Sequence, residues 1–221
     1  MSPHVDNGVS APGRAVVLRL QALNFAYPGQ PALVSDWSAS IGPGVTLLHG
    51  DTGSGKSTLL RLLAGALPAT GGRLTLAGVH LDEDARAYQR AVFFCDPTTD
   101  AFDQRTARDT TTLLSAGDAH FSATCWQGLI DGFALSAHLD KPMYMLSTGS
   151  KRKVWLAAAL ASGRALVLLD EPTGALDAAS VGCLWAELTR FAGPAERAIV
   201  VASAERIDRV PLAGVIELPL G

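Results

Sequence analysis

Cysteine is scarce in this chain, and the few present are not arranged as a binding site. Only three occur in 221 residues, at Cys95, Cys125 and Cys183. Their odd number and wide separation favour reduced thiols in a cytosolic protein over a disulfide framework. The five histidines show no metal-ligand spacing, so no zinc site is expected. We predict that the thiols are small buried side chains.

Long apolar runs and an excess of positive charge are also missing. Although 48% of the residues are hydrophobic, no run approaches the roughly 20 apolar residues that span a bilayer. The best candidate, residues 154–169, is broken by Ser162, Gly163 and Arg164, which are typical of a loop. A net charge of -3 gives no basic surface for a nucleic acid. The sequence therefore predicts no direct membrane span and no nucleic-acid partner.

The first residues show no targeting signal. Residues 1–13 are polar, contain glycine and proline, and have neither the basic nor the apolar region of a signal peptide. We expect a disordered tail there. The length of the chain fits one core with an inserted subdomain.

A glycine-rich segment fills every required position of the phosphate-binding pattern G-x-x-x-x-G-K-[ST]. It is Gly50-Asp51-Thr52-Gly53-Ser54-Gly55-Lys56-Ser57-Thr58. Its glycines let the backbone approach a polyphosphate with the N–H groups turned inward. Lys56 supplies a cation for the outer phosphates, and the Ser57 hydroxyl can bind Mg²⁺. Residues 45–48 predict a preceding strand and residues 59–63 a following helix, so we expect a nucleoside triphosphate site.

A pair of acids follows a second apolar run. Residues 166–169 predict a buried strand that ends in Asp170 and Glu171. The carboxyl end of a parallel strand faces the ligand crevice of such a sheet. Asp170 can hold Mg²⁺ through water beside Ser57, and Glu171 can polarise a water aimed at the γ-phosphate. Alone, the pair would fit an exposed strand end equally well; with the glycine-rich loop it predicts a metal ligand and a catalytic carboxylate.

The remaining pattern predicts an α/β fold, namely a P-loop NTPase core with a mostly parallel sheet. We assign residues 14–95 and 151–221 to a RecA-like core, which includes an N-terminal antiparallel β lobe. Further core elements are predicted as strands over 16–20, 23–25, 35–41, 73–76, 92–95 and 198–201 and helices over 151–161 and 178–191.

Residues 96–150 have weak helical periodicity and are assigned to a helical subdomain inserted in the core. Its candidate internal side chains are Leu113, Leu114, Trp126, Leu129, Ile130, Phe133, Leu135 and Leu139.

From Leu20 to Leu218 these motifs resemble, in order, those of the ATP-binding cassette (ABC) family. Leu146-Ser147-Thr148-Gly149-Ser150 is similar to the family's LSGGQ signature, with Ser147 and Gly149 matched and two positions substituted. The resemblance implies that two cassettes pack head to tail and that Ser147 and Gly149 cap the γ-phosphate bound by the partner. In isolation the same segment is typical of an ordinary serine-capped helix.

Two further segments match the family. Phe25-Ala26-Tyr27-Pro28-Gly29 resembles the aromatic A-loop, in which Tyr27 would stack on adenine, whereas a core tyrosine at a strand end is the alternative. Gly174-Ala175-Leu176-Asp177 resembles the D-loop, in which Asp177 helps to connect the two sites of the dimer. For the basic run at residues 151–153 we expect a solvated helix face.

Two positions depart from the family pattern. The family usually has glutamine where this chain has Asp96, which could still meet Mg²⁺ or its waters. After the strand at 198–201, the family places a histidine that contacts the γ-phosphate, but this chain has Ala202-Ser203-Ala204-Glu205. Ser203 and Asp96 are therefore the candidate catalytic groups beside Glu171, and the site has one stabiliser of phosphoryl charge fewer.

The resemblance implies the ATP-binding and hydrolysing subunit of a bacterial ABC transporter, with ATP and Mg²⁺ as cofactors. It also implies a second ABC subunit, in a homodimer or heterodimer, and a separate integral membrane permease. The chain would then be cytoplasmic and peripheral on the inner face of the membrane. The missing histidine leaves an alternative open: a slow or degenerate ATP-dependent dimerisation switch, acting as the inactive half of a heterodimer or as a regulator. The motifs do not specify the cargo or the direction of transport.

Overall fold

The computed structural model describes residues 15–94, 96, 99–191 and 196–220. The predicted tail at 1–13 and Cys95 lie outside the described residues. No helix in the described part of the chain is long and apolar enough to cross a bilayer.

The N-terminal part forms an antiparallel sheet in the order β2-β1-β4-β5. Its strands are β1 (Leu18–Ala26), β2 (Ala32–Ile41), β4 (Gly71–Leu76) and β5 (Val79–His80). The sequence predicted two short strands where β1 is continuous. A register shift between Gln21 and Asn24 takes up Ala22, whose φ is 49°, so the chain bulges and then resumes pairing.

The second sheet is parallel throughout, in the order β6-β7-β8-β3-β9. It consists of β3 (Gly44–His49), β6 (Val92–Phe94), β7 (Leu166–Asp170), β8 (Ala198–Ser203) and β9 (Leu212–Glu217). The central strands are buried almost from end to end because layers cover both faces of the sheet. The predicted α/β fold, with a parallel sheet and an antiparallel lobe, is confirmed.

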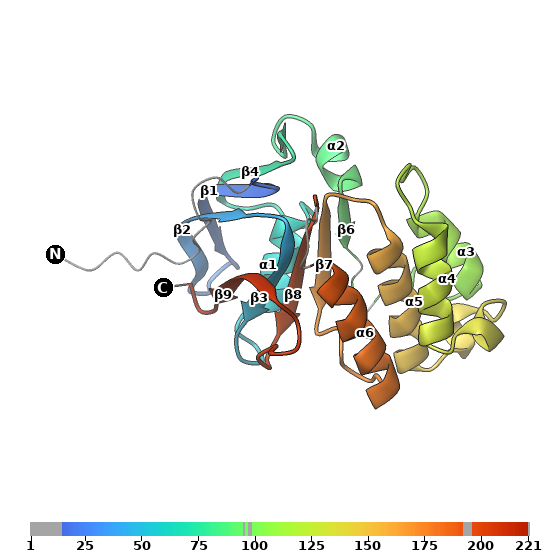
Figure 1. The fold of residues 1–221 in the computed structure, drawn as a ribbon. Helices are drawn as coiled ribbons and strands as arrows, with labels where there is room; N and C mark the ends of the chain where they lie inside the picture. Colours follow the sequence, from blue (N-terminus) through green and yellow to red (C-terminus); the bar gives the residue numbers. More distant parts are fainter. Residues whose placement is uncertain (1–14, 95, 97–98, 192–195, 221) are drawn as a thin grey trace.

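The helices form layers on either side of the parallel sheet (Figure 1). Helix α1 (Lys56–Leu63) lies between the two sheets, and its leucines share one core with both. Helices α5 (Thr148–Ala161) and α6 (Ala178–Arg190) cover the opposite face, where a second core forms. Helices α3 (Ala107–Leu114) and α4 (Ala123–Gly132) and two 3-10 turns, Ser136–His138 and Met143–Met145, lie outside α5. The segment predicted to be a helical insert is therefore helical.

Most candidate internal side chains of this insert are internal. Leu129, Ile130, Phe133, Leu135 and Leu139 are buried, and Leu114 and Trp126 are half-buried. Leu113 is 44% exposed, so its prediction was wrong. Helix α3 instead buries Ala107, Thr110 and Thr111, positions that share one helical face, and Leu113 lies off that face.

Some elements escaped prediction because they are short or peripheral. Strand β5 has two residues, and helix α2 (Ala85–Arg90) has six. Strand β9 is at the sheet edge and buries little of its length, so it lacks the apolar run of a central strand. Cys125 and Cys183 are half-buried rather than buried as predicted. Burial, aided by Glu187, still raises the pKa of the Cys125 thiol to about 12, which keeps it protonated.

Two glycines with left-handed backbone should differ in how much stability the protein loses when each is replaced by alanine, because only one of them packs on the bulge of β1. Gly72 has φ 93°, and a Cβ there would lie 2.6 Å from the Ala22 carbonyl carbon. Gly78, in the β4–β5 hairpin, has φ 85° with nothing within 4 Å. Gly78→Ala should cost about 1 kcal/mol of unfolding free energy from backbone strain alone. Gly72→Ala should cost at least about 2 kcal/mol more, because two backbones must separate. Urea denaturation measures both variants, and equal losses would contradict the packing of Gly72 on the bulge.

Candidate nucleotide-binding site

The predicted site residues gather where three neighbouring strands of the parallel sheet end. In the strand register, His49 on β3 pairs with Ser203 on β8, and Asp170 on β7 pairs with Ala202. The glycine-rich loop, the acidic pair and the segment after β8 therefore leave the same edge of the sheet. This edge is where open parallel sheets bind ligands.

The glycine-rich loop is shaped to accept phosphate. Gly53 and Gly55 have φ of 83° and 97°, and a Cβ on Gly55 would overlap the Leu33 side chain. Helix α1 begins without a side-chain cap. Its first N–H groups therefore lack the hydroxyl or carboxylate partner that caps the other helices, and an anion can take that place.

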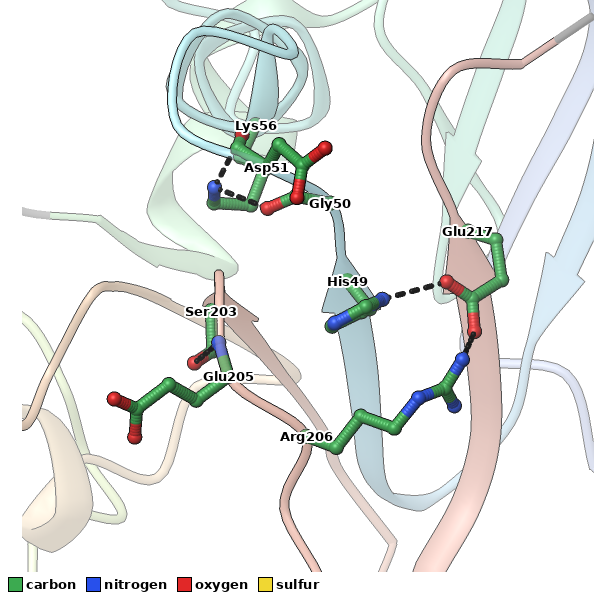
Figure 2. A network of polar contacts seen from close by, with 8 residues as sticks. All are labelled: His49, Gly50, Asp51, Lys56, Ser203, Glu205, Arg206 and Glu217. Carbon is green, nitrogen blue, oxygen red and sulfur yellow. Dashed lines mark hydrogen bonds and ion pairs between the residues drawn. The ribbon is translucent and has the colours of Figure 1, made fainter.

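Lys56 is turned back into this loop. Its ammonium donates to the carbonyl oxygens of Gly50 and Asp51 at 2.7 and 3.0 Å (Figure 2). It also lies 3.2 Å from Oε1 of Glu171, and only 6% of its side chain is exposed. All of these partners are oxygens, so phosphate oxygens can replace them without leaving the charge unpaired.

The two acids after β7 differ in their surroundings. Burial raises the pKa of Asp170, although a hydrogen bond from Ser57 opposes the shift, and nearby Glu171 and Asp96 add repulsion. Oδ1 of Asp170 is buried without a hydrogen-bond partner among the described residues. A buried carboxylate oxygen beside a serine hydroxyl matches the hard oxygen ligands that Mg²⁺ prefers, so these residues fit the metal.

Glu171 is more open, with 42% of its side chain exposed. Its backbone has φ 42°, a left-handed value that is uncommon outside glycine. Its carboxylate accepts a hydrogen bond of 2.9 Å from the N–H of Ala204. Loop and acids together line a pocket of about 330 Å³. The lining residues are Thr52, Gly53, Gly55, Lys56, Ser57, Thr58, Asp170 and Glu171.

A family model described as "ABC transporter" matches residues 34–174, which include the loop, the signature segment and the acidic pair. The chain belongs to this family. Members use ATP, normally with Mg²⁺, and hydrolyse it. Their ATP-binding subunits dimerise and work with membrane permeases.

Curated relatives agree on the family and differ in what they transport. The chain is 35% identical to the cytochrome c biogenesis ATP-binding export protein CcmA of Rhodospirillum rubrum, over 86% of this chain and 81% of the relative. It is also 35% identical to the cobalt import ATP-binding protein CbiO of Rhodobacter capsulatus, over 74% of this chain. The match spans 61% of the length of that cobalt protein.

Solved structures show the same fold. An ATP-binding subunit of an ABC transporter superposes with a TM-score of 0.72 at 20% identity, covering 84% of this chain and 79% of the other. The cbiO1 protein of Clostridium perfringens gives a TM-score of 0.63 at 23% identity, with 86% and 79% covered.

The ABC signature segment caps its own helix. The Ser147 hydroxyl accepts from the N–H of Ser150 at 3.1 Å, so α5 begins at Thr148, earlier than the predicted Lys151. Gly149 packs on the carbonyl of Ala175, where a Cβ would overlap it. Ser147 and Gly149 do not line the pocket of their own chain's glycine-rich loop.

The basic run after the signature is not the solvated face that we predicted. Lys151 pairs with Asp103 at 2.6 Å, and Lys153 pairs with Asp177 at 2.7 Å. Arg152 donates to two backbone carbonyls. Charge patterning missed these contacts because all the partners are distant in sequence. Asp177 also caps α6 by accepting from the N–H of Ser180. The hydrogen bonds from Lys153 and Ser180 lower the pKa of Asp177.

Tyr27, the predicted adenine platform, is 43% exposed, so the alternative of a core tyrosine is wrong. Its hydroxyl lies 3.2 Å from Oγ1 of Thr58, at the start of α1. Its ring stacks edge-to-face on Phe25 at 5.0 Å between centroids. The structure thus brings an exposed aromatic ring to the glycine-rich loop.

Asp96, at the family's glutamine position, forms an ion pair of 2.6 Å with Arg61 of α1. The pair raises the pKa of Arg61. The sequence predicted that Asp96 could meet Mg²⁺ or its waters; in the structure the partner of its carboxylate is the Arg61 guanidinium.

Ser203 is buried, with 7% exposed. Its hydroxyl accepts from the N–H of Glu205 at 3.0 Å (Figure 2). Its carbonyl accepts from the N–H of Gly50 at 3.4 Å. The group that reaches Glu171 from this loop is the N–H of Ala204. Sequence reasoning missed it because a backbone donor leaves no mark on residue type.

A second polar network joins the segment after β8 to the edge strand β9. Glu217 of β9 pairs with His49 at 2.7 Å and with Arg206 at 2.9 Å (Figure 2). The hydrogen bond from His49 lowers the pKa of Glu217. Figure 2 shows His49 pointing away from Lys56, toward β9. This network ties Arg206, in the segment after β8, to the edge strand β9.

Replacing Lys56 tests the loop. In Lys56→Ala the pocket loses the cation nearest the outer phosphates, and Glu171 loses its ion-pair partner. We expect Mg-ATP affinity measured by calorimetry to fall at least about 10²-fold. Lys141→Ala, which removes a lysine that contacts exposed His138 on the helical insert, is the control and should bind as wild type. Equal affinity in the two variants would contradict the site.

Proposed function

We propose that this chain is the ATP-hydrolysing subunit of an ABC transporter, held at the cytoplasmic face of the membrane by a separate permease. The observation that carries the proposal is the convergence of Lys56, Asp170 and Glu171 on one pocket at the sheet edge. Residues 14–95 and 151–221 form the nucleotide-binding core, and residues 96–150 form the signature subdomain. Relatives are named for export and for import of unlike cargoes, so no cargo is assigned.

Each residue has a role set by its surroundings. Lys56 binds the outer phosphates, and Tyr27 stacks on adenine. Ser57 and Asp170 would hold Mg²⁺, which would supply positive charge to offset the charge of the phosphates. Glu171 accepts a proton from the attacking water, and the hydrogen bond from the Ala204 N–H orients the Glu171 carboxylate for this step. Asp96, paired with Arg61, lies close enough to Asp170 to raise the pKa of that carboxyl further.

A single chain does not complete this site. Ser147 and Gly149 lie outside the pocket, on the helical side of the molecule. We infer that the signature helix of a second ABC subunit supplies its N-terminus to the γ-phosphate, while Asp177 connects the two sites. ATP binding therefore drives dimerisation.

Glu171→Gln tests the dimer. The amide keeps the size of the side chain but accepts no proton, so bound ATP persists. We expect an ATP-dependent dimer by light scattering with Mg-ATP and a monomer with Mg-ADP. Glu83→Gln, which changes an exposed acid on the antiparallel lobe, is the matched control: any dimer that it forms with Mg-ATP should decay as the ATP is hydrolysed, whereas the Glu171→Gln dimer should persist. A monomer under saturating ATP, both alone and with candidate partner subunits, would refute the arrangement.

The segment after β8 favours slow turnover. The position at which the family has histidine holds Ala204, whose N–H donates to Glu171 and whose side chain has no polar group. Ser203 is occupied within its own loop. Loss of one group that stabilises transition-state charge typically costs about 10²- to 10³-fold in rate. A slowly hydrolysing switch, acting as the weaker half of a heterodimer or as a regulator, is therefore the second candidate function.

Restoring the imidazole distinguishes the two candidates. We expect the wild-type homodimer to turn over well below the roughly 10 s⁻¹ that is ordinary for enzymes. Ala204→His should raise kcat several-fold with little change in KM, because the gain appears only in the transition state. Ala204→Leu adds bulk without a polar group and should not raise the rate. Wild-type turnover at tens per second would instead favour the ordinary motor.

A further inference from the structure

Arg152 joins the signature helix to the backbone of Glu171. From the second turn of α5, its Nη1 donates to the carbonyl oxygen of Glu171 at 2.7 Å and to that of Gly174 at 2.8 Å. Arg152 is half-buried. Two charge-assisted bonds from one partly buried nitrogen form a strong and directional restraint.

The carbonyl that Arg152 contacts belongs to a residue in an uncommon conformation. At φ 42°, Glu171 turns sharply as it leaves β7, and this turn decides where its carboxylate points. Its N–H is held by the carbonyl of Ala202 at 3.0 Å, and its carbonyl also accepts from the N–H of Gly174 at 3.1 Å. Backbone groups of Ala202 and Gly174 thus bond to the N–H and the carbonyl of Glu171. The side chain of Arg152 on α5 adds a further bond to that carbonyl.

Gly174 makes room for this contact. A Cβ at Gly174 would overlap Nη1 of Arg152. The backbone of Gly174 is not left-handed, since it is not among the positive-φ residues. The glycine is therefore needed here for space rather than for its conformational freedom. Guanidinium and glycine form one fitted contact between α5 and the segment after β7.

We propose that Arg152 is a positioning residue for ATP hydrolysis, which fixes the general base Glu171 through its backbone and ties it to the signature helix. Ser147 caps α5 and Arg152 follows within the same helix. Contact of the signature with the partner's ATP is thereby transmitted to the carboxylate of the same chain. This inference rests on the proposed function.

The first test needs no catalysis. Hydrogen exchange of the wild-type chain is compared with Arg152→Gln, which loses the charge and the two-carbonyl contact. We expect the amides of Glu171 and of residues 173–176 to exchange at least about tenfold faster in the variant, while β7 stays protected. Lys151→Gln, which breaks only the neighbouring pair with Asp103, is the control and should leave 171–176 unchanged. Unchanged exchange in Arg152→Gln would overturn the proposal.

The second test separates positioning from binding. Arg152→Gln should lower kcat about 10²-fold, the effect of misplacing a catalytic group by about 1 Å, with the ATP dissociation constant within about twofold. Arg152→Lys, which keeps a cation, should recover part of the loss. Equal losses of affinity and rate would overturn the proposal, as would wild-type kcat in Arg152→Gln. A wild-type chain with no turnover would refute the proposed function. The hydrogen-exchange result would then still test whether Arg152 restrains the backbone of Glu171.

Gly174→Ala supplies an independent variant if Arg152→Gln folds poorly. The added methyl displaces the guanidinium from the carbonyls while leaving its charge in place. We expect it to reproduce the fall in kcat and to add little in a double variant with Arg152→Gln. Fully multiplicative effects would show that the two residues act separately, which contradicts a shared contact.

Discussion

Lateral pairing of β7, β8 and β3 is the constraint on which the site depends. Their register sets Asp170 beside Ala202 and Ser203 beside His49. Side chains alternate across a strand, so a slip of one residue would move each of them to the opposite face. The apolar side chains of these strands are almost wholly buried between two cores, and such burial specifies the register strongly. The packing of apolar side chains, which take no part in the reaction, therefore fixes the relative positions of the residues at the site.

The charges at this edge are balanced only in part. Lys56 faces Glu171, and Arg61 faces Asp96, while the buried Oδ1 of Asp170 has no hydrogen-bond partner among the described residues. Burial of an acid in this way works against folding, as the raised pKa of Asp170 indicates. A dication with phosphate would satisfy that oxygen. The cost is consistent with a residue kept for binding rather than for stability.

Local patterns predicted the parts of the site that depend on residue type at fixed spacing. The glycine-rich loop, the strand that ends in Asp170 and the parallel core were predictable because each depends on glycine, lysine or a run of apolar residues at a fixed position. Leu113 was misplaced because threonines and an alanine, rather than leucines alone, form the packed face of α3. The partners of Lys151 and Lys153 and the N–H of Ala204 could not be foreseen, since the first are distant in sequence and the last is common to nearly every residue.

Under the proposed function, the segment after β8 keeps the geometry of the site while changing its chemistry. The family resemblance implies a histidine side chain at position 204 in contact with the γ-phosphate, and the backbone N–H at this position donates to Glu171 whichever side chain it carries. Alanine keeps that backbone bond and gives up the polar contact. The loop remains anchored by Ser203 to Gly50 on one side and by Arg206 to Glu217 on the other. In the proposed mechanism, alignment of Glu171 therefore does not require the histidine, whereas stabilisation of the phosphoryl charge does, and these two demands are separable at this position.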